Sequence, residues 1–101
     1  MKTFVIIGRD SAAGRALRKQ HRPAHLAHMA ELSAQGRVRF AGPLLSIEDG
    51  GPQGSVIVID AEDLDAARAI AERDPYVTTG VFGSYELHES MQVFPEAPTP
   101  G

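Results

Sequence analysis

The sequence predicts an α+β domain of ferredoxin-like βαββαβ order, in which two helices cover one face of a four-stranded antiparallel sheet. Two observations predict this fold class. A length of 101 residues suits a single domain. Four short apolar or alternating segments are typical of strands, and two segments with helical periodicity are interleaved with them in the order strand, helix, strand, strand, helix, strand.

The four strands are predicted from apolar patterns that end at turn residues. Residues 4–7 form a continuous apolar run, typical of a strand buried on both faces. Residues 38–43 and 81–89 alternate with period two, and 55–60 is a second apolar run. Pro43 predicts the end of the second strand, because proline cannot donate a hydrogen bond to a neighbouring strand.

The first helix is predicted to begin at Pro23, since proline lacks the N–H group that a first helical turn leaves unpaired. It would run to Gln35 and end at Gly36. The preceding residues 11–21 fit either a short exposed helix or a loop. His25 would border the inward stripe of the helix, which consists of Leu26, Met29, Ala30 and Ser33.

The second helix is predicted to start after an Asp63 cap and to end before Pro75, because the residue that precedes a proline disfavours helical geometry. Residues 1–94 are expected to form the single domain. Residues 95–101 are rich in proline and have the composition of a disordered end.

Composition excludes several classes of protein. The sequence contains no cysteine, so disulfides and thiolate chemistry are excluded. A net charge of -3 with scattered Lys and Arg does not indicate nucleic-acid binding. The N-terminal apolar run is too short for a signal peptide or a membrane span, so no membrane partner is expected and the expected location is cytoplasmic.

No cofactor and no metal are expected. The glycines at 50–54 follow no phosphate-binding pattern, which argues against nucleotide cofactors. His25 and His28 lie three positions apart, but no Glu or Asp on their helix completes a metal site at Glu-x-x-His spacing.

The sheet face without helices predicts a partner. Phe4, Ile6, Phe40 and alternate residues of 55–59 are expected to expose an apolar surface there, and such a surface usually marks an interface. We therefore expect a homodimer that closes through this open sheet face.

His25 is the first candidate for chemistry. In a first helical turn the positive end of the helix dipole would favour its neutral form, which is the form a base requires, although a surface histidine is the alternative. Asp74 lies at the end of the second helix, where a carboxylate opposes the dipole at a cost of about 0.3–1 kcal/mol. The residue types leave a paired role and a turn-starting role for Asp74 equally open.

Four residues are candidates for substrate binding. Arg22 has the planar donor set that suits an anion, though a solvated arginine is equally compatible. Tyr76 fits either a pocket wall or a packed core ring. Ser46 can bind a ligand or simply belong to a loop, and Gly42 allows close backbone approach or marks a bulge.

Three segments resemble the YCII-related (YciI-like) family: Arg22-Pro23-x-His25-Leu26, Ala41-Gly42-Pro43, and Asp74-Pro75-Tyr76 with Gly80-Val81. The resemblance covers about residues 1–94. It implies a dimeric α+β barrel with a His–Asp pair between helices and sheet, here His25 and Asp74. Most of that family has no assigned substrate, at least one relative is similar to a dehydrochlorinase acting on a chlorinated hydroxyquinol, and the wider superfamily includes lactone isomerases and cofactor-free oxygenases. The resemblance therefore implies a site without fixing a reaction.

These observations predict a small cofactor-free enzyme for elimination, isomerisation or hydrolysis of a small polar or aromatic metabolite. His25 would be the base or acid, Asp74 would orient it, and Arg22 would anchor the substrate. The alternative is a non-catalytic dimeric module that binds a small molecule in the same pocket.

Overall fold

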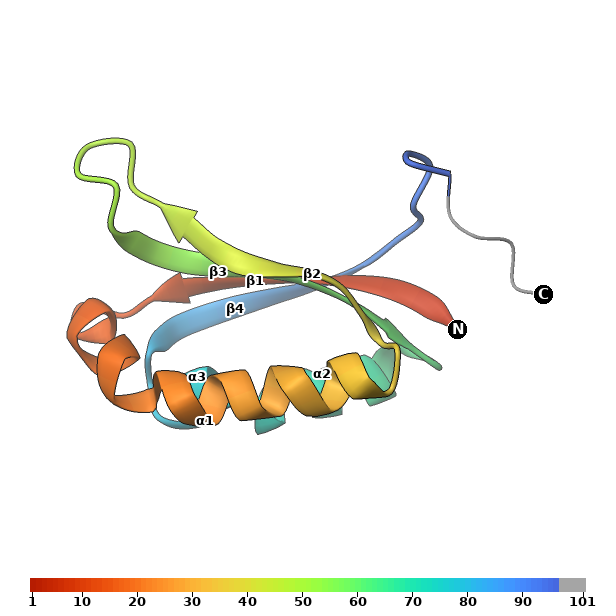
Figure 1. Cartoon of the computed structure of the whole chain (residues 1–101), viewed down its shortest axis with the longest axis horizontal. Coiled ribbons are helices and arrows are strands. Elements are labelled where there is room, and N and C mark those ends of the chain that lie inside the picture. Colours follow the sequence, from red (N-terminus) through yellow and green to blue (C-terminus); the bar gives the residue numbers. More distant parts are fainter. Residues whose placement is uncertain (97–101) are drawn as a thin grey trace.

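Four strands and two main helices follow one another in the predicted order, and the predicted fold class is confirmed. The computed structural model describes residues 1–96. The elements are β1 (Lys2–Asp10), α1 (Gly14–Ala34), β2 (Val38–Leu45), β3 (Pro52–Ala61), α2 (Leu64–Arg73), the short α3 (Pro75–Thr78) and β4 (Phe82–Ser90). All three helices lie on one side of the sheet (Figure 1). This is the βαββαβ order of a ferredoxin-like fold, with the short α3 added before β4.

The sheet is antiparallel throughout, with strand order β2-β3-β1-β4. Phe4 of β1 pairs with Ile59 of β3, and Ile6 pairs with both Ile57 of β3 and Leu87 of β4. These side chains share the face that the helices cover. They form one core with Met29, Leu32, Ala67, Ile70 and Ala71 of the helices.

The open face of the sheet differs from the prediction in strand β1. Phe4 and Ile6 are only 0% and 2% exposed because they face the helices. Alternation along a strand places the half-buried Val5 and Ile7 on the opposite face. Residues 4–7 are apolar on both sides, so their pattern could not show which side faces the helices. Phe40 is exposed and pairs with Val58 on the open face, as predicted.

Helix α1 begins at Gly14, so the predicted start at Pro23 is wrong and Pro23 lies inside the helix. The earlier turns are held by tertiary contacts: Arg18 is buried and paired with Asp10 of β1, and Leu17 packs against a second cluster of buried residues. The predicted inward stripe is also rotated. The buried positions of α1 are Gly14, Arg18, His25, Met29 and Leu32, whereas Leu26, Ala30 and Ser33 are exposed.

Strand β2 continues through Pro43 to Leu45, contrary to the predicted end at Pro43. Proline is tolerated there because β2 lies at an edge of the sheet, where one side of the strand needs no partner. The predicted cap of α2 is confirmed, since Asp63 accepts a 2.8 Å hydrogen bond from the Ala66 N–H.

Within residues 1–96, no helix has both the length and the apolar character needed to cross a membrane. The predicted disordered end, residues 95–101, lies mostly outside the described residues, which include only Pro95 and Glu96 of it.

Replacing Pro23 with alanine tests its position inside α1. A proline in a helix interior destabilises the folded protein by about 3 kcal/mol relative to alanine. Proline also restricts the unfolded chain, so its replacement makes the unfolded state more favourable by about 0.4–1 kcal/mol and reduces the net gain in stability by that amount. We expect Pro23→Ala to raise the free energy of unfolding by about 2–2.6 kcal/mol in urea titrations. Pro43→Ala, in an edge strand, is the matched control and should bring no increase. Equal effects of the two substitutions would contradict the helical interior position.

Candidate functional site

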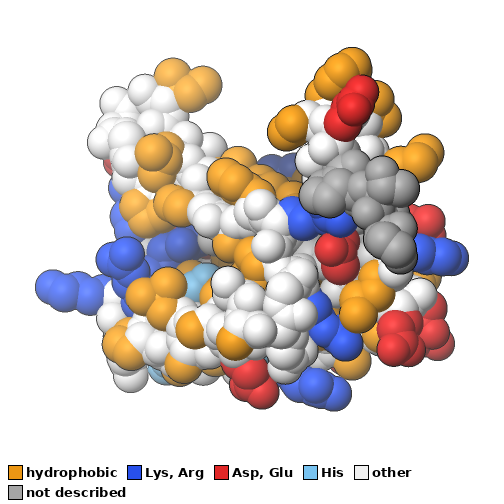
Figure 2. All heavy atoms as spheres, turned by 45° about the vertical axis from the view of Figure 1, so that its right-hand side comes forward, with side chains coloured by type: hydrophobic (Ala, Val, Ile, Leu, Met, Phe, Trp, Pro, Cys, Tyr) orange, Lys and Arg blue, Asp and Glu red, His pale blue; other side chains and the backbone are white. Residues whose placement is uncertain are grey.

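A cleft of about 940 Å³ opens between α1 on one side and strands β2 and β3 on the other. The exposed Leu26, Ala30 and Ser33 line it, so the stripe predicted to face the core faces this cleft instead. Figure 2 shows the hollow, with a histidine side chain at its bottom and Lys and Arg side chains beside it. The cleft therefore combines apolar walls with a positively charged end.

His25 and Asp74 meet at the inner wall of this cleft. Nδ1 of His25 lies 2.8 Å from Oδ1 of Asp74, and the two residues are only 8% and 3% exposed. Because an ionised carboxylate can only accept, the Nδ1–H donates and Nε2 is left as an acceptor. Nε2 of His25 has no hydrogen-bond partner within residues 1–96. Every fully buried polar side-chain atom in that range has a partner, so Nε2 is not fully buried. We infer that it is accessible from the cleft that His25 lines.

The same carboxylate also caps a helix. Oδ1 of Asp74 accepts a 2.9 Å hydrogen bond from the Tyr76 N–H at the start of α3. Asp74 therefore has both of the roles considered for it, since it pairs with His25 and also starts the turn that leads into α3. The predicted position of Asp74 at the C-terminal end of α2 is confirmed, and Asp74 also precedes α3, where a carboxylate is favoured and the unfavourable dipole of α2 is offset. The dipole argument for His25 is wrong, since His25 lies in the middle of α1.

Tyr76 holds the imidazole from its face. The two rings are stacked with centroids 3.9 Å apart and an angle of 3° between their planes. Phe82 supports Tyr76 edge-on at 5.6 Å. Burial raises the pKa of the Tyr76 hydroxyl, while the charges of Arg18 and Arg22 act in the opposite direction. Tyr76 is therefore both a core ring and part of the cleft lining.

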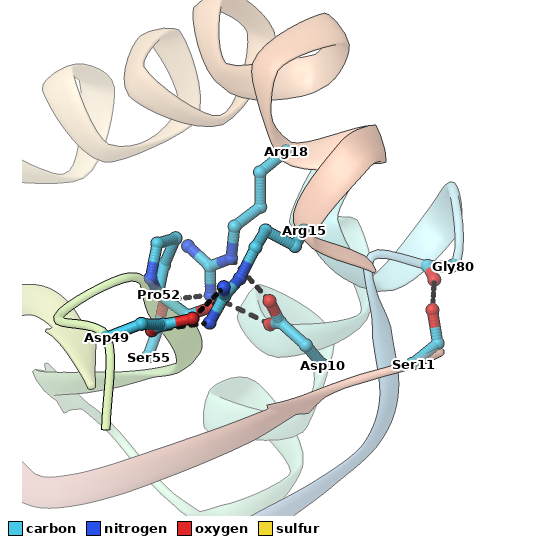
Figure 3. Close-up of polar contacts among 8 residues, drawn as sticks. All are labelled: Asp10, Ser11, Arg15, Arg18, Asp49, Pro52, Ser55 and Gly80. Carbon is cyan, nitrogen blue, oxygen red and sulfur yellow. Dashed lines mark hydrogen bonds and ion pairs between the residues drawn. The ribbon is translucent and has the colours of Figure 1, made fainter. Parts of the chain in front are cut away.

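Arg18 lines the cleft and is not among the site residues predicted from the sequence. It is 8% exposed and forms a two-point ion pair with Asp10 at 2.7 and 2.9 Å. Its Nη2 also donates to Ser55 Oγ at 3.1 Å, and Figure 3 shows the guanidinium reaching between these partners. The available signal was the spacing of the cations at 15, 18, 19 and 22, which places them on one helical face.

The remaining predicted residues separate into two groups. Arg22 of α1 and Gly42 of β2 line the cleft. Ser46 lies outside the lining residues and accepts a 3.2 Å hydrogen bond from the Glu48 N–H within its own loop. Ser55, not predicted, lines the cleft through β3. Among residues 1–96, no three His, Asp or Glu side chains gather as metal ligands.

Comparison of the sequence with known proteins identifies a family and its relatives. The model of the YCII-related domain matches residues 1–90. Protein YciI of Escherichia coli O6:H1 is 35% identical over 96 residues, which cover 90% of this chain and 98% of that protein. An uncharacterized protein of Haemophilus influenzae is 33% identical with the same coverage.

Comparison of the structure identifies enzymes of the same fold. A complex of 5-chloro-2-hydroxyhydroquinone dehydrochlorinase from Burkholderia phenoliruptrix with 2,5-dihydroxybenzoquinone superposes with a TM-score of 0.80 and 26% identity, over 88% of this chain and 93% of that one. SnoaB, a cofactor-independent oxygenase from Streptomyces nogalater, has a TM-score of 0.60 and 14% identity over 95% of this chain and all of that one, which shows a shared fold. The chain therefore has a small fold that enzymes use.

Removing the Asp74 carboxylate should cost more than removing a helix cap alone. A cap contributes about 1 kcal/mol, and the hydrogen bond to His25 adds about 1.5–3 kcal/mol. We expect Asp74→Ala to lower the free energy of unfolding by about 2–4 kcal/mol. Asp74→Asn should cost less, because its amide oxygen can still accept.

The matched control is Asp63→Ala, which removes the α2 cap but no second partner. Urea titrations of the three variants measure the difference. Equal losses for Asp63→Ala and Asp74→Ala would show that the contact with His25 contributes nothing.

Proposed function

The chain belongs to the YCII-related family, and from this premise we propose that it is a small enzyme that transfers a proton on a bound metabolite without a cofactor. One observation carries the proposal. The imidazole of His25 is fixed by a 2.8 Å hydrogen bond to Asp74 and by stacking on Tyr76 at 3.9 Å, with Nε2 directed to a large cleft. A fixed imidazole of known tautomer is what general acid–base catalysis requires.

The proposed chemistry follows from this arrangement. Nε2 of His25 takes a proton from the substrate and becomes part of an imidazolium, whose charge the Asp74 carboxylate stabilises. In elimination or isomerisation the proton then goes to solvent, to the leaving group or to another substrate atom. In hydrolysis Nε2 instead takes its proton from a water molecule, whose oxygen bonds to the substrate while the leaving group departs with a proton. The likeness to a dehydrochlorinase favours elimination of HCl, in which Nε2 takes a proton from a C–H or O–H bond, the electron pair of that bond forms a new double bond, and chloride leaves with the electron pair of the C–Cl bond.

The cleft suits a small, partly apolar molecule. Leu26, Met29 and Ile57 contribute apolar surface, and Arg22 is placed to anchor a polar group. Gly42 allows a ligand to approach the β2 backbone closely.

A non-catalytic binding module is the second candidate. The observation that favours it is the number of acid–base groups at the cleft. Among the described residues that line the cleft, His25 is the only His, Asp or Glu. A second imidazole or carboxylate would therefore have to come from another chain, and Lys19 and Tyr76 are the other lining side chains that can exchange a proton.

We also propose that two copies of the chain associate through the open sheet face. Val5, Ile7, Val56 and Val58 are half-buried there and have no helix above them. The β2–β3 loop and the segment after β4 rise beyond the same face (Figure 1), and they carry the exposed Ile47 and Phe94. An apolar sheet face flanked by exposed apolar side chains favours binding of a second copy of the chain, which would bury both.

The catalytic proposal is tested with 5-chloro-2-hydroxyhydroquinone and related chlorinated hydroxyquinols, with chloride release as the measurement. His25→Gln should slow release by about 100-fold or more, because it removes the base. Asp74→Asn should also slow it, since the tautomer of His25 is no longer fixed. His28→Gln is the matched control on the same helix and lies outside the cleft lining. Wild-type rates in His25→Gln would overturn the catalytic role, and binding without turnover would favour the module.

The dimer is tested by light scattering coupled to size exclusion. Val58→Arg places a charge in the middle of the open face and should yield a monomer, because an unpaired charge is not tolerated in an apolar interface. Leu64→Arg, at an exposed apolar position on α2, is the control and should leave the dimer intact. A wild-type monomer at micromolar concentration would contradict the proposal.

A further inference from the structure

We propose that the cleft selects an anionic substrate and that Arg18 holds the negatively charged oxygen, with Lys19 and Arg22 attracting it at the mouth. The chemical class is a small carboxylate, phenolate or enolate with an apolar or aromatic body. The inference rests on the proposed function only in assuming that the reacting part of the molecule lies beside His25.

The charge of the cleft points to an anion. Four cations of α1 line it, and no Asp or Glu is among its described lining residues. Two of the cations already have a carboxylate partner, since Arg15 pairs with Asp49 at 2.7 Å and Arg18 pairs with Asp10 through Nε and Nη2, which leaves Nη1 of Arg18 unpaired within residues 1–96. Lys19 and Arg22 are exposed and form no ion pair within residues 1–96. A concave surface lined by one sign of charge concentrates ligands of the opposite sign.

Arg18 offers a donor that is already fixed. Asp10 occupies Nε and Nη2, and Ser55 shares Nη2 (Figure 3). Nη1 has no hydrogen-bond partner within residues 1–96. Every fully buried polar side-chain atom in that range has a partner, so Nη1 is not fully buried. We infer that it is accessible from the cleft that Arg18 lines. A guanidinium held in this way loses little conformational freedom when it binds an oxyanion. Arg22, by contrast, is exposed and must be ordered by the ligand.

Arg18 also lies at a suitable distance from His25. Its guanidinium carbon is 5.0 Å from the centre of the Tyr76 ring, and the His25 imidazole is 3.9 Å from the same centre. The two groups are therefore no further apart than the sum of these distances. In the proposed complex a substituted ring spans this distance, with one substituent at Nη1 of Arg18 and another at Nε2 of His25.

This placement supplies a group that the proposed chemistry needs. When Nε2 removes a proton from a hydroxylated or carbonyl substrate, negative charge develops on a substrate oxygen. A fixed cation at that oxygen stabilises the charge as it forms. Arg18 would then be a catalytic residue by direct contact with the substrate, and Asp10 would be the residue that positions it.

Binding of two matched probes tests the proposal. 2,5-Dihydroxybenzoate and 2,5-dihydroxybenzamide share a ring and its hydroxyl groups but differ by one negative charge. We expect isothermal titration calorimetry at low salt to give at least a 10-fold tighter dissociation constant for the benzoate. The preference should fall as salt is added, because exposed charges are screened. Equal affinities, including binding of neither probe, would overturn the proposal.

Variants assign the preference to residues. Lys19→Gln and Arg22→Gln should each weaken benzoate binding several-fold, whereas Arg68→Gln on α2, outside the cleft lining, should not. Arg18→Gln alone would leave Asp10 buried without its cation, so the test uses Arg18→Gln combined with Asp10→Asn. This folded double variant should lose most of the benzoate preference. Retention of the full preference would overturn the role of Arg18.

The same probes separate this inference from the catalytic proposal. His25→Gln should lose chloride release but keep the preference for the benzoate, because its anion-binding groups are intact. An active wild type without an anion preference would remove only the present inference. An anion preference without turnover of any substrate would remove only the catalytic proposal.

Discussion

A single carboxylate oxygen, Oδ1 of Asp74, connects the helical layer of this protein to its candidate site. It accepts one hydrogen bond from the backbone of Tyr76 and one from the imidazole of His25. The first contact starts α3, and the second fixes α1 against the junction of α2 and α3. A buried carboxylate is stable only with such partners. The local fold and the orientation of the imidazole therefore depend on the same atom.

A chain of ring contacts continues this dependence into the sheet. Tyr76 stacks on His25 and rests edge-on against Phe82, and the Phe82 ring lies over Gly8 of β1, where a Cβ would clash with it. The absence of a side chain at position 8 thus makes room for Phe82, which supports Tyr76, which in turn supports the imidazole. Close packing of this kind transmits a small change in the strand to the site.

The order of elements and the Asp63 cap could be predicted because they depend on local patterns. His25 and Asp74 were named as a pair only through a resemblance, since neither residue type nor spacing shows which residues meet in space. The start of α1 was predicted wrongly because a local rule for Pro23 was outweighed by the tertiary contacts of Arg18. Arg18 itself was missed because its partners, Asp10 and Ser55, lie on two strands far apart in the sequence.

The wrongly predicted helix start also explains the charge of the cleft. A helix that began at Pro23 would leave residues 15–22 in a loop, whereas the observed α1 places Arg15, Arg18, Lys19 and Arg22 on the face that lines the cleft. The buried pair of Arg18 with Asp10 holds this part of the helix on β1. A buried ion pair is rarely more stabilising than apolar residues of the same volume. In the proposed role of Arg18, the pair serves to hold the guanidinium in a fixed position at the cleft.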